Sequence, residues 1–342
     1  MTQVEIAAAI LWLGVVLYSL FAGADFGAGF LDLVAGRDDN ATRQRRLIEH
    51  SIGPVWEANH VWLIFVLVVM WTCFPVLFAS VFSTLYVPLS LAGAGVIIRG
   101  SAFAFRKVLV ADWQRRIAGV GFAISSILTP FFLGVSAGAV ASGGVPPGIA
   151  GAGPIASWFS PVPVFTGLLA IATCVFLAAT FLVGDAQRAG EHDLAKSFTN
   201  KAVVAGAVAG LISMIGLLLL HSQASFLYHG LLTHALGLVV LSAVAGLATI
   251  ALLLTRHWIA ARLSAGAAVA AVLWAWAVAQ FPYALAPTRS HPGLELGQVA
   301  ALPSVLGATL TSLLVGAIVL VPSLIALYRV VSSGRWIQDS HG

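Results

Sequence analysis

One stretch, residues 52–74, indicates the class of the fold; it reads IGPVWEANHVWLIFVLVVMWTCF. After His60 this stretch contains no charged residue. A helix needs about 20 mostly apolar residues to cross the hydrocarbon core of a bilayer, and the stretch is long enough. Pro54 suits the first turn of a helix, because its missing N–H is not needed there and its fixed φ matches. The stretch is therefore predicted to be a membrane-spanning helix that begins near Pro54.

The rest of the chain has the same apolar character. Its 342 residues are 60% hydrophobic and only 9% charged, with a mean hydropathy of +0.99. Soluble domains carry about 25% charged residues, so a water-exposed surface is excluded for most of the chain. The apolar runs predict an all-α integral membrane protein, a single transmembrane domain over residues 1–342 with about nine helices. The helices are expected at about 6–34, 52–74, 76–98, 117–140, 162–184, 202–221, 226–254, 258–281 and 304–330.

The positions of the basic residues predict the orientation. All but one of the 17 Lys and Arg residues follow spans one, three, five, seven and nine, and the exception is Arg289. Because short cytoplasmic loops are enriched in Lys and Arg, the N-terminus is expected outside and the C-terminus in the cytoplasm. This distribution also accounts for the net charge of +4 without nucleic acid as a partner. The Gly- and Pro-rich segment 141–161 is predicted to be an irregular outer loop.

Several smaller features are consistent with this class of protein. No Lys or Arg precedes the first apolar run, and Asp25 interrupts it, so a removable signal peptide is not expected. Cys73 and Cys174 share no CxxC spacing and are expected to be buried small side chains. Arg99 lies at the end of the third apolar run, where we expect it to extend to the cytoplasmic interface.

Asp25 is the clearest ionisable residue inside a predicted span. It lies in the segment 23–29, which reads GADFGAG. An ionisable group within a span is costly and is therefore a candidate functional residue. Gly23, Gly27 and Gly29 would let other helices approach closely and enclose the carboxylate. Two interpretations remain open: Asp25 handles protons, or it is a hydrogen-bonded side chain that fixes helix packing.

Glu57 and His60 form a second cluster at the start of the second span. They are three residues apart and therefore share a helix face, which Glu49 and Gly53 continue toward the cytoplasm. A carboxylate and an imidazole there could pass protons inward, or could form an ion pair that holds the helix start. The residues expected to support the Asp25 and Glu57 region structurally are Gly23, Gly27, Gly29, Pro54, Trp56, Asn59 and Trp62.

Metal and haem sites within this chain are disfavoured by the sequence. Glu57 and His60 match half of a di-iron motif, but no second Glu-x-x-His occurs, so no metal site is expected. Haem could be held by two histidines on facing helices. However, His221, His229 and His234 lie near one surface, and the last two share one segment. No cofactor is therefore assigned to this chain alone.

The motifs together resemble subunit II of the cytochrome bd-type quinol oxidases. The most specific part is the run 52–63 (IGPVWEANHVWL). The resemblance extends from end to end of the chain, and its weaker parts are DFGAG at 25–29, the arginines at 43–46, Tyr86-Val87-Pro88, Arg99-Gly100 and Phe281-Pro282-Tyr283.

The resemblance implies a fold of two four-helix bundles plus one peripheral helix, in a bacterial cytoplasmic membrane. It implies a heterodimer with a haem-bearing subunit I, which carries haem b and haem d, oxidises quinol and reduces oxygen to water. This chain would then be part of a quinol:oxygen oxidoreductase without catalytic residues of its own. The resemblance also allows for a bound quinone and for a small single-helix third subunit.

By position, Asp25 and Glu57 match two carboxylates that the family links to a proton route from the cytoplasm. The chain departs from the family pattern nearby: Glu57 stands where many members have Asp, Ala58 where Gly is common, and His60 where Gln or Glu is usual. We therefore include His60 as a candidate extra proton relay.

Two alternative functions remain. A bd-like complex could carry a different haem set or use a different electron donor, because those sites would lie on the partner. A proton-coupled secondary transporter could use Asp25 and Glu57 as substrate ligands. Transporters usually have paired halves with broken helices, and the glycine-rich stretch around Asp25 has no counterpart in the second half.

Overall fold

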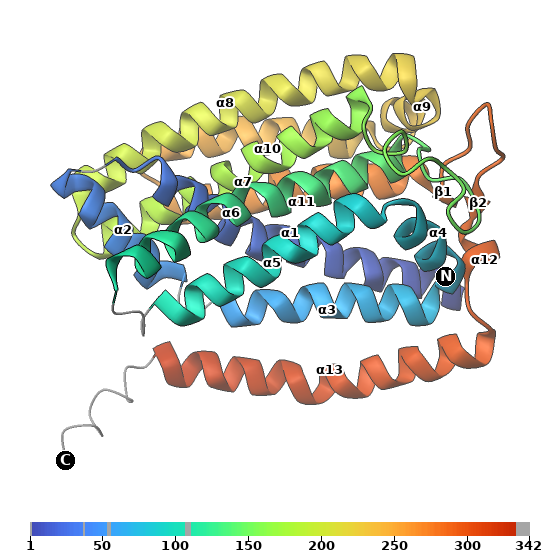
Figure 1. Ribbon diagram of the computed structural model, residues 1–342, viewed down its shortest axis with the longest axis horizontal. Helices are drawn as coiled ribbons and strands as arrows, with labels where there is room; N and C mark the ends of the chain where they lie inside the picture. The colour runs from blue at the N-terminus through green and yellow to red at the C-terminus, as the bar shows by residue number, and fades with distance from the viewer. Residues whose placement is uncertain (1, 37, 53–55, 107–110, 333–342) are drawn as a thin grey trace.

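The computed structural model describes residues 2–36, 38–52, 56–106 and 111–332, and long helices that lie side by side dominate it (Figure 1). Apolar side chains and internally satisfied backbone hydrogen bonds make helices the suitable element for a bilayer. The helices are α1 Gln3–Leu33, α2 Asp39–Ile52, α3 Trp56–Cys73, α4 Pro75–Thr84, α5 Tyr86–Arg106, α6 Asp112–Ala141, α7 Pro161–Arg188, α8 His192–Gln223, α9 Ser225–Thr233, α10 Leu236–Leu254, α11 Trp258–Gln280, α12 Leu296–Val299 and α13 Pro303–Ser332.

Within the described residues, seven helices are long and apolar enough to cross a membrane, or eight if α3 and α4 form one broken span. The axes of α3 and α4 differ by 118°. Pro75 explains the break, because a proline cannot continue the preceding helix and instead begins the next one. The all-helical membrane fold expected from the sequence is thus confirmed.

Two of the predicted spans are each divided in the structure. The expected run 76–98 is α4 followed by α5, and α5 continues to Arg106. Pro88 accounts for the division: in an unbroken helix its ring would clash with the carbonyl of Thr84, whereas in the first turn of α5 it is tolerated. The expected run 226–254 is likewise α9 followed by α10, with the break at His234 and Ala235.

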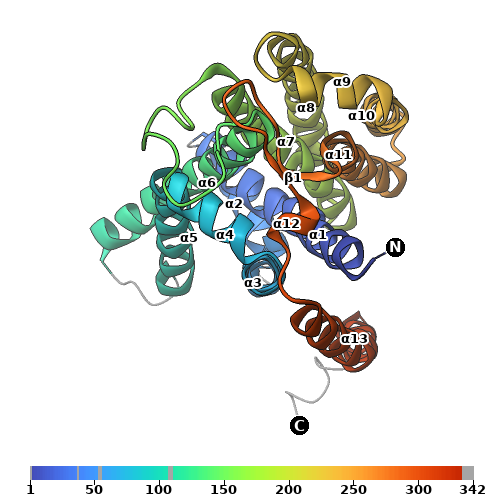
Figure 2. The ribbon, with the colours of Figure 1, turned by 90° about the vertical axis from the view of Figure 1, so that its right-hand side faces the viewer.

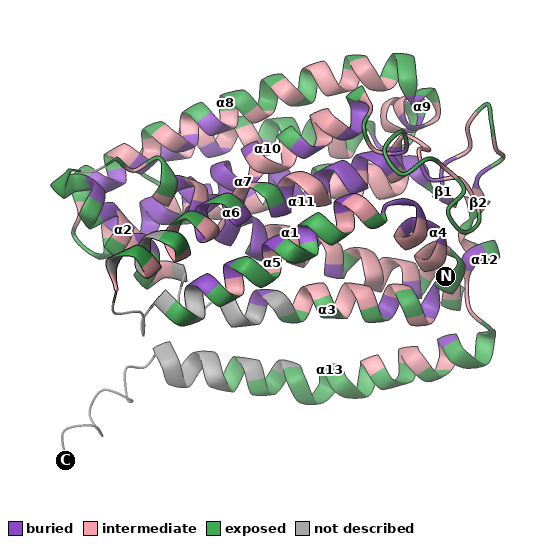
Figure 3. Cartoon of the chain, in the orientation of Figure 1, coloured by how far each residue is buried: buried purple, intermediate pink, exposed green. Residues whose placement is uncertain are grey.

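Helix α1 lies at the centre of the packing. It contacts α3, α6, α7 and α11, while α5 packs on α6, α7 on α8, and α10 on α11. Figure 2 shows α13 outside the other helices, where it contacts α1 and α3. Most of its described residues are exposed, whereas the buried residues concentrate along α1, α6, α7 and α11 (Figure 3).

Polar contacts bring three connections together at the end of the molecule that carries α2. Arg43 of α2 forms an ion pair with Glu191, just before α8, and Lys201 Nζ donates to Gln44 Oε1 at 2.6 Å. Arg262 near the start of α11 contacts Asp185 near the end of α7. The connections α1–α2, α7–α8 and α10–α11 therefore share one end, at the left of Figure 1.

The opposite end carries the irregular structure. There β1 (Tyr283–Leu285) and β2 (Leu294–Glu295) form an antiparallel pair in which Tyr283 lies opposite Glu295. The segment 142–160 has no helix or strand among its residues, all of which are described. The irregular loop expected at 141–161 is confirmed apart from its two end residues, Ala141, the last of α6, and Pro161, the first of α7. Cys73 and Cys174 are unbridged and buried, as expected.

Candidate functional site

The glycines around Asp25 bring α1 against its neighbours. A Cβ atom at Gly27 would overlap the backbone carbonyl of Cys174 in α7, and a Cβ at Gly29 would lie 2.8 Å from Nη1 of Arg99. Only residues without side chains permit such close approach. Asp25 is consequently 6% exposed. The close approach expected of the three glycines is thus seen at Gly27 and Gly29, whereas a Cβ at Gly23 would make only an ordinary contact, 3.4 Å from Leu177 Cδ1.

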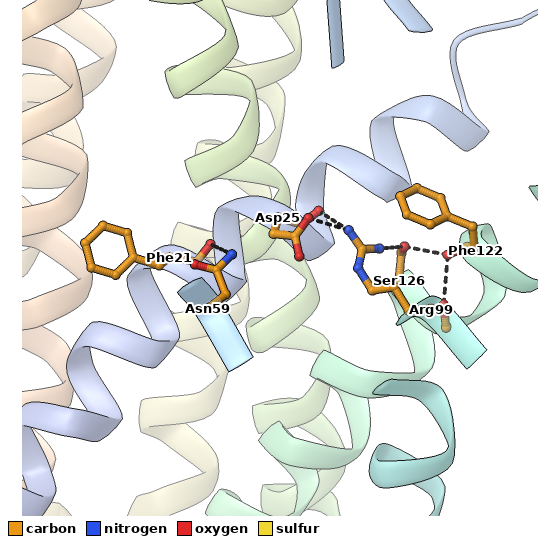
Figure 4. Close-up of polar contacts among 7 residues, drawn as sticks. Phe21, Asp25, Asn59, Arg99, Phe122 and Ser126 are labelled. Atoms are coloured by element: carbon orange, nitrogen blue, oxygen red, sulfur yellow. Dashed lines mark hydrogen bonds and ion pairs between the residues drawn. The ribbon is translucent and has the colours of Figure 1, made fainter. Parts of the chain in front are cut away.

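Arg99 of α5 is the direct partner of Asp25. Its Nη2 atom lies 2.6 Å from Asp25 Oδ1 and also donates to the backbone carbonyl of Asp25 at 2.8 Å (Figure 4). Its Nη1 atom donates to Ser126 Oγ of α6. The arginine thus joins α5 to α1 and α6 through charge-assisted hydrogen bonds, the stronger class in proteins.

The expectation that Arg99 extends to the interface is wrong. The side chain is 0% exposed, because α5 continues for two further turns and Asp25 offers a counter-charge inside the bundle. A lone buried guanidinium would be very costly, and its pairing with a carboxylate makes the burial of both groups tolerable.

Aromatic rings and a serine complete the surroundings of the guanidinium. Its Cζ atom lies 4.2 Å from the ring centroid of Phe122 and 5.0 Å from that of Phe26. Cations are attracted to aromatic ring faces at such distances. Ser126 in turn donates to the carbonyl of Phe122 at 2.6 Å, which orients its hydroxyl oxygen toward Arg99. The pair is therefore fixed in place from three helices.

Asn59 connects α3 to the same region. It is 2% exposed, and its Nδ2 atom donates to the carbonyl of Phe21, one turn before Asp25, at 3.4 Å. Trp62 of α3 contacts Phe65 edge-on, with ring centroids 5.9 Å apart. The start of α3 and the middle of α1 are thus brought together.

The other predicted site residues of this cluster are not placed. Gly53 and Pro54 lie outside the described residues, and of Trp56, Glu57 and His60 only the helical backbone in α3 is described. The hypotheses that Glu57 and His60 relay protons therefore stay predictions.

The histidines considered for haem in the sequence are surface residues in the structure. His221, His229 and His234 are exposed at the end opposite α2, and the ring of His221 packs edge-on against Tyr228. No group of three His, Cys, Asp or Glu residues in the described part of the chain could hold a metal ion.

Comparison with known proteins identifies the family. The sequence model of the family "Cytochrome bd terminal oxidase subunit II" matches residues 3–331. Subunit 2 of the cytochrome bd-I ubiquinol oxidase of Escherichia coli (strain K12) is 32% identical over 147 residues, which are 42% of this chain and 38% of that protein. A putative cytochrome bd menaquinol oxidase subunit II of Bacillus subtilis (strain 168) is 24% identical over 238 residues, 68% of this chain and 66% of the relative.

The similarity to a solved structure covers nearly the whole fold. A chain of the bd oxidase from Geobacillus thermodenitrificans has a TM-score of 0.74 and 24% sequence identity, with 98% of this chain and 100% of that chain covered. This similarity shows a shared arrangement of helices. Because the family model matches almost the entire sequence, the chain belongs to the cytochrome bd terminal oxidase subunit II family.

Proposed function

We propose that this multi-pass membrane protein works as subunit II of a bd-type quinol:oxygen oxidoreductase. The single observation that carries the proposal is the family match over residues 3–331. The printed names of its relatives, a ubiquinol oxidase subunit and a putative menaquinol oxidase subunit, support quinol as the electron donor. In the proposed complex, haem b and haem d on subunit I supply the electron-transfer and oxygen-reducing chemistry.

The proposed orientation places the end with α2 in the cytoplasm and the N-terminus outside. Its support is the grouping of cations at the α2 end, where Arg43, Arg188, Lys201 and Arg262 all make their contacts. Cytoplasmic loops carry the excess of Lys and Arg. Protons for water formation then come from this end of the molecule.

The proposed contribution of this chain to turnover is to supply those protons past Asp25 and Glu57, with His60 as an additional relay. The buried position of Asp25 and the contact of Asn59 in α3 with α1 support a common polar region between the two helices. Arg99 provides a fixed positive charge in this region. The Asp25 carboxylate that would take up and release the proton therefore has a permanent counter-ion.

The experiment that tests the assembly is purification of the tagged chain from native membranes in mild detergent. We expect a second multi-span subunit to co-purify, with b-type and chlorin-type haem bands in the reduced-minus-oxidised spectrum. A colourless preparation without a partner would refute the proposal, and b-type haem alone would favour a complex with a different haem set. Mass spectrometry of the same sample shows whether a quinone and a small single-helix subunit are bound.

The proton-supply role is tested separately by quinol-driven oxygen consumption of the purified complex. Glu57→Gln removes an ionisable group and is expected to lower turnover, whereas Glu57→Asp keeps the acid and is expected to retain more of it. His60→Gln is expected to lower turnover if the imidazole is a relay; unchanged turnover in that variant would exclude it.

A further inference from the structure

The connection between α6 and α7, at the end of the molecule opposite α2, lacks the groups that usually face water. Residues 142–160 contain no charged residue and no histidine, and three of them are prolines, which have no backbone N–H to hydrate. The connection 281–302, at the same end, carries Arg289, His291 and Glu295. Because charged side chains are mostly exposed to water, this contrast sets the segment 142–160 apart from a solvated loop.

The first half of the segment is fixed on α4. The backbone amides of Gly148 and Ala150 donate to the hydroxyl oxygens of Ser80 and Ser83, at 3.2 and 2.8 Å. Val145 is buried in a cluster with apolar side chains of α4 and α6. The segment therefore has a defined position on the bundle.

The second half forms a turn that is attached to α6. The ring of Trp158 packs edge-on against Phe132, with ring centroids 6.1 Å apart, and its Nε1 atom donates to the carbonyl of Pro154 at 2.7 Å. The amide of Phe159 donates to the carbonyl of Ile155 at 2.8 Å, as in one turn of an α-helix. Residues four apart in such a turn share a face, so Ile155 and Phe159 are neighbours on its surface.

This turn directs apolar side chains outward and a polar side chain inward. Ile155 and Phe159 are 59% and 67% exposed, whereas Ser157 is 4% exposed. A turn in water favours the opposite arrangement, with the hydroxyl outside and the large apolar groups inside. Apolar side chains that are held exposed mark a surface that contacts a partner or a membrane.

The position of the turn and its hydrogen bonds favour lipid as what covers this surface. Trp158 and Phe159 lie just before Pro161, where the candidate membrane span α7 begins, and tryptophan is enriched at that level of a bilayer. The amides of Ser157, Trp158 and Phe159 donate to carbonyls within the turn, and backbone groups close to hydrocarbon need such internal partners. Figure 2 shows the segment beside α6, on the side of the molecule away from α13.

We propose that the turn 153–159 lies in the headgroup region of the outer leaflet, with Ile155 and Phe159 inserted among the upper parts of the acyl chains. Phospholipid, and not a protein partner, covers this face, and the turn fixes the depth of the start of α7 in the bilayer. The lipid contact does not rest on the proposed function. Only its assignment to the outer leaflet rests on the proposed orientation.

Fluorescence quenching in lipid nanodiscs that hold the intact complex tests the contact. Ile155→Cys and Phe159→Cys are each labelled with bimane, a small environment-sensitive fluorophore. Ser290→Cys, at an exposed position of the connection 281–302, is the matched control. The complex without an added cysteine gives the background label. The quenchers are phospholipids with a nitroxide in the headgroup or in the upper acyl chain, and iodide in the water.

We expect the nitroxide lipids to quench the labels at Ile155→Cys and Phe159→Cys strongly and iodide to quench them weakly, with the reverse at Ser290→Cys. Quenching of the first two labels by iodide alone would show that the turn faces water. Quenching by neither agent would show that a protein subunit covers it. Either result overturns the proposal.

A charged substitution gives a second measurement. Ile155→Asp, combined with the label at Phe159→Cys, is expected to weaken quenching by lipid and to strengthen quenching by iodide, because a carboxylate resists transfer from water. Ile155→Leu keeps the apolar contact and is expected to change neither. Unchanged quenching in a correctly assembled Ile155→Asp complex would contradict the insertion. Because the fluorescence needs no oxidase activity, lipid quenching in a complex without haem would refute the proposed function and leave the membrane contact standing.

Discussion

Arg99 donates through one nitrogen atom, Nη2, to both the carboxylate and the backbone carbonyl of Asp25, 74 residues earlier in the chain. Arg99 of α5 therefore recognises both the backbone and the charge of a single residue of α1. The contact agrees with one of the two interpretations left open by the sequence, that Asp25 fixes helix packing; the other, that Asp25 handles protons, stays a prediction.

The first prediction separates these roles by a double-mutant cycle. Asp25→Asn and Arg99→Gln each leave one buried charge without its partner, which costs about 3–5 kcal/mol in comparable pairs. We expect both single variants to lower the yield of assembled complex. The double variant removes both charges and is expected to recover yield, measured by size-exclusion chromatography and haem content, but not turnover.

The double variant also provides the decisive control. If it recovers turnover along with assembly, the pair has only a structural role, and the proton-supply proposal for Asp25 is wrong. If turnover stays low in a fully assembled complex, the ionisable carboxylate itself is needed.

The second prediction concerns the glycines of α1. A methyl group at Gly27 would overlap the Cys174 carbonyl and lie 2.8 Å from the Cβ of Ala178, so α1 and α7 must separate. Overpacking of this kind costs about 1–3 kcal/mol. Gly23→Ala is the matched control, because its new Cβ would lie 3.4 Å from Leu177 Cδ1, an ordinary contact.

We expect Gly27→Ala to lower the melting temperature of the detergent-solubilised complex and Gly23→Ala to leave it nearly unchanged. Equal melting temperatures for the two variants would contradict the close approach of α1 and α7 at Gly27.

The extent of the long helices could be predicted from the sequence, because an apolar run is a local signal. The breaks were harder to place. The break at Pro75 falls between the expected runs 52–74 and 76–98, but the break before Pro88 lies inside the run 76–98, where hydropathy alone does not distinguish a bent pair of helices from one straight span. The steric effect of Pro88 on the carbonyl of Thr84, four residues earlier, decides the matter and divides this run into α4 and α5.

The candidate site could be predicted only in part for a related reason. Asp25 is recognisable because an acid among glycines inside a span is unusual. Its partner is not, because helical spacing relates residues on one helix and says nothing about which residue of another helix faces them. One signal was available for Arg99: the residues from 100 to 105 carry no charge before Arg106, so the helix could continue and leave Arg99 inside.

The third prediction contrasts an exposed ion pair with the buried one. Arg43 and Glu191 join α2 to the start of α8, and the carboxylate raises the pKa of the Arg43 guanidinium through a hydrogen bond and its charge. Their side chains are 45% and 36% exposed, so water and salt screen the interaction. We expect Arg43→Ala and Glu191→Gln to leave the melting temperature unchanged within error, in contrast to Arg99→Gln. A large drop in either variant would show that this contact is needed to hold α2 on the bundle.

The fourth prediction concerns the contact that attaches α3 to α1. Asn59 is buried and donates from Nδ2 to the Phe21 carbonyl, so Asn59→Ala removes one hydrogen bond, worth about 1 kcal/mol net, along with some packing. Asn59→Asp has nearly the same shape but places an acceptor against an acceptor and adds a buried charge near Asp25. We therefore expect the aspartate variant to be the less stable of the two, with the larger fall in melting temperature and in assembled yield. The reverse order would show that a donor at position 59 is not required and that α3 is held to α1 mainly by its apolar side chains.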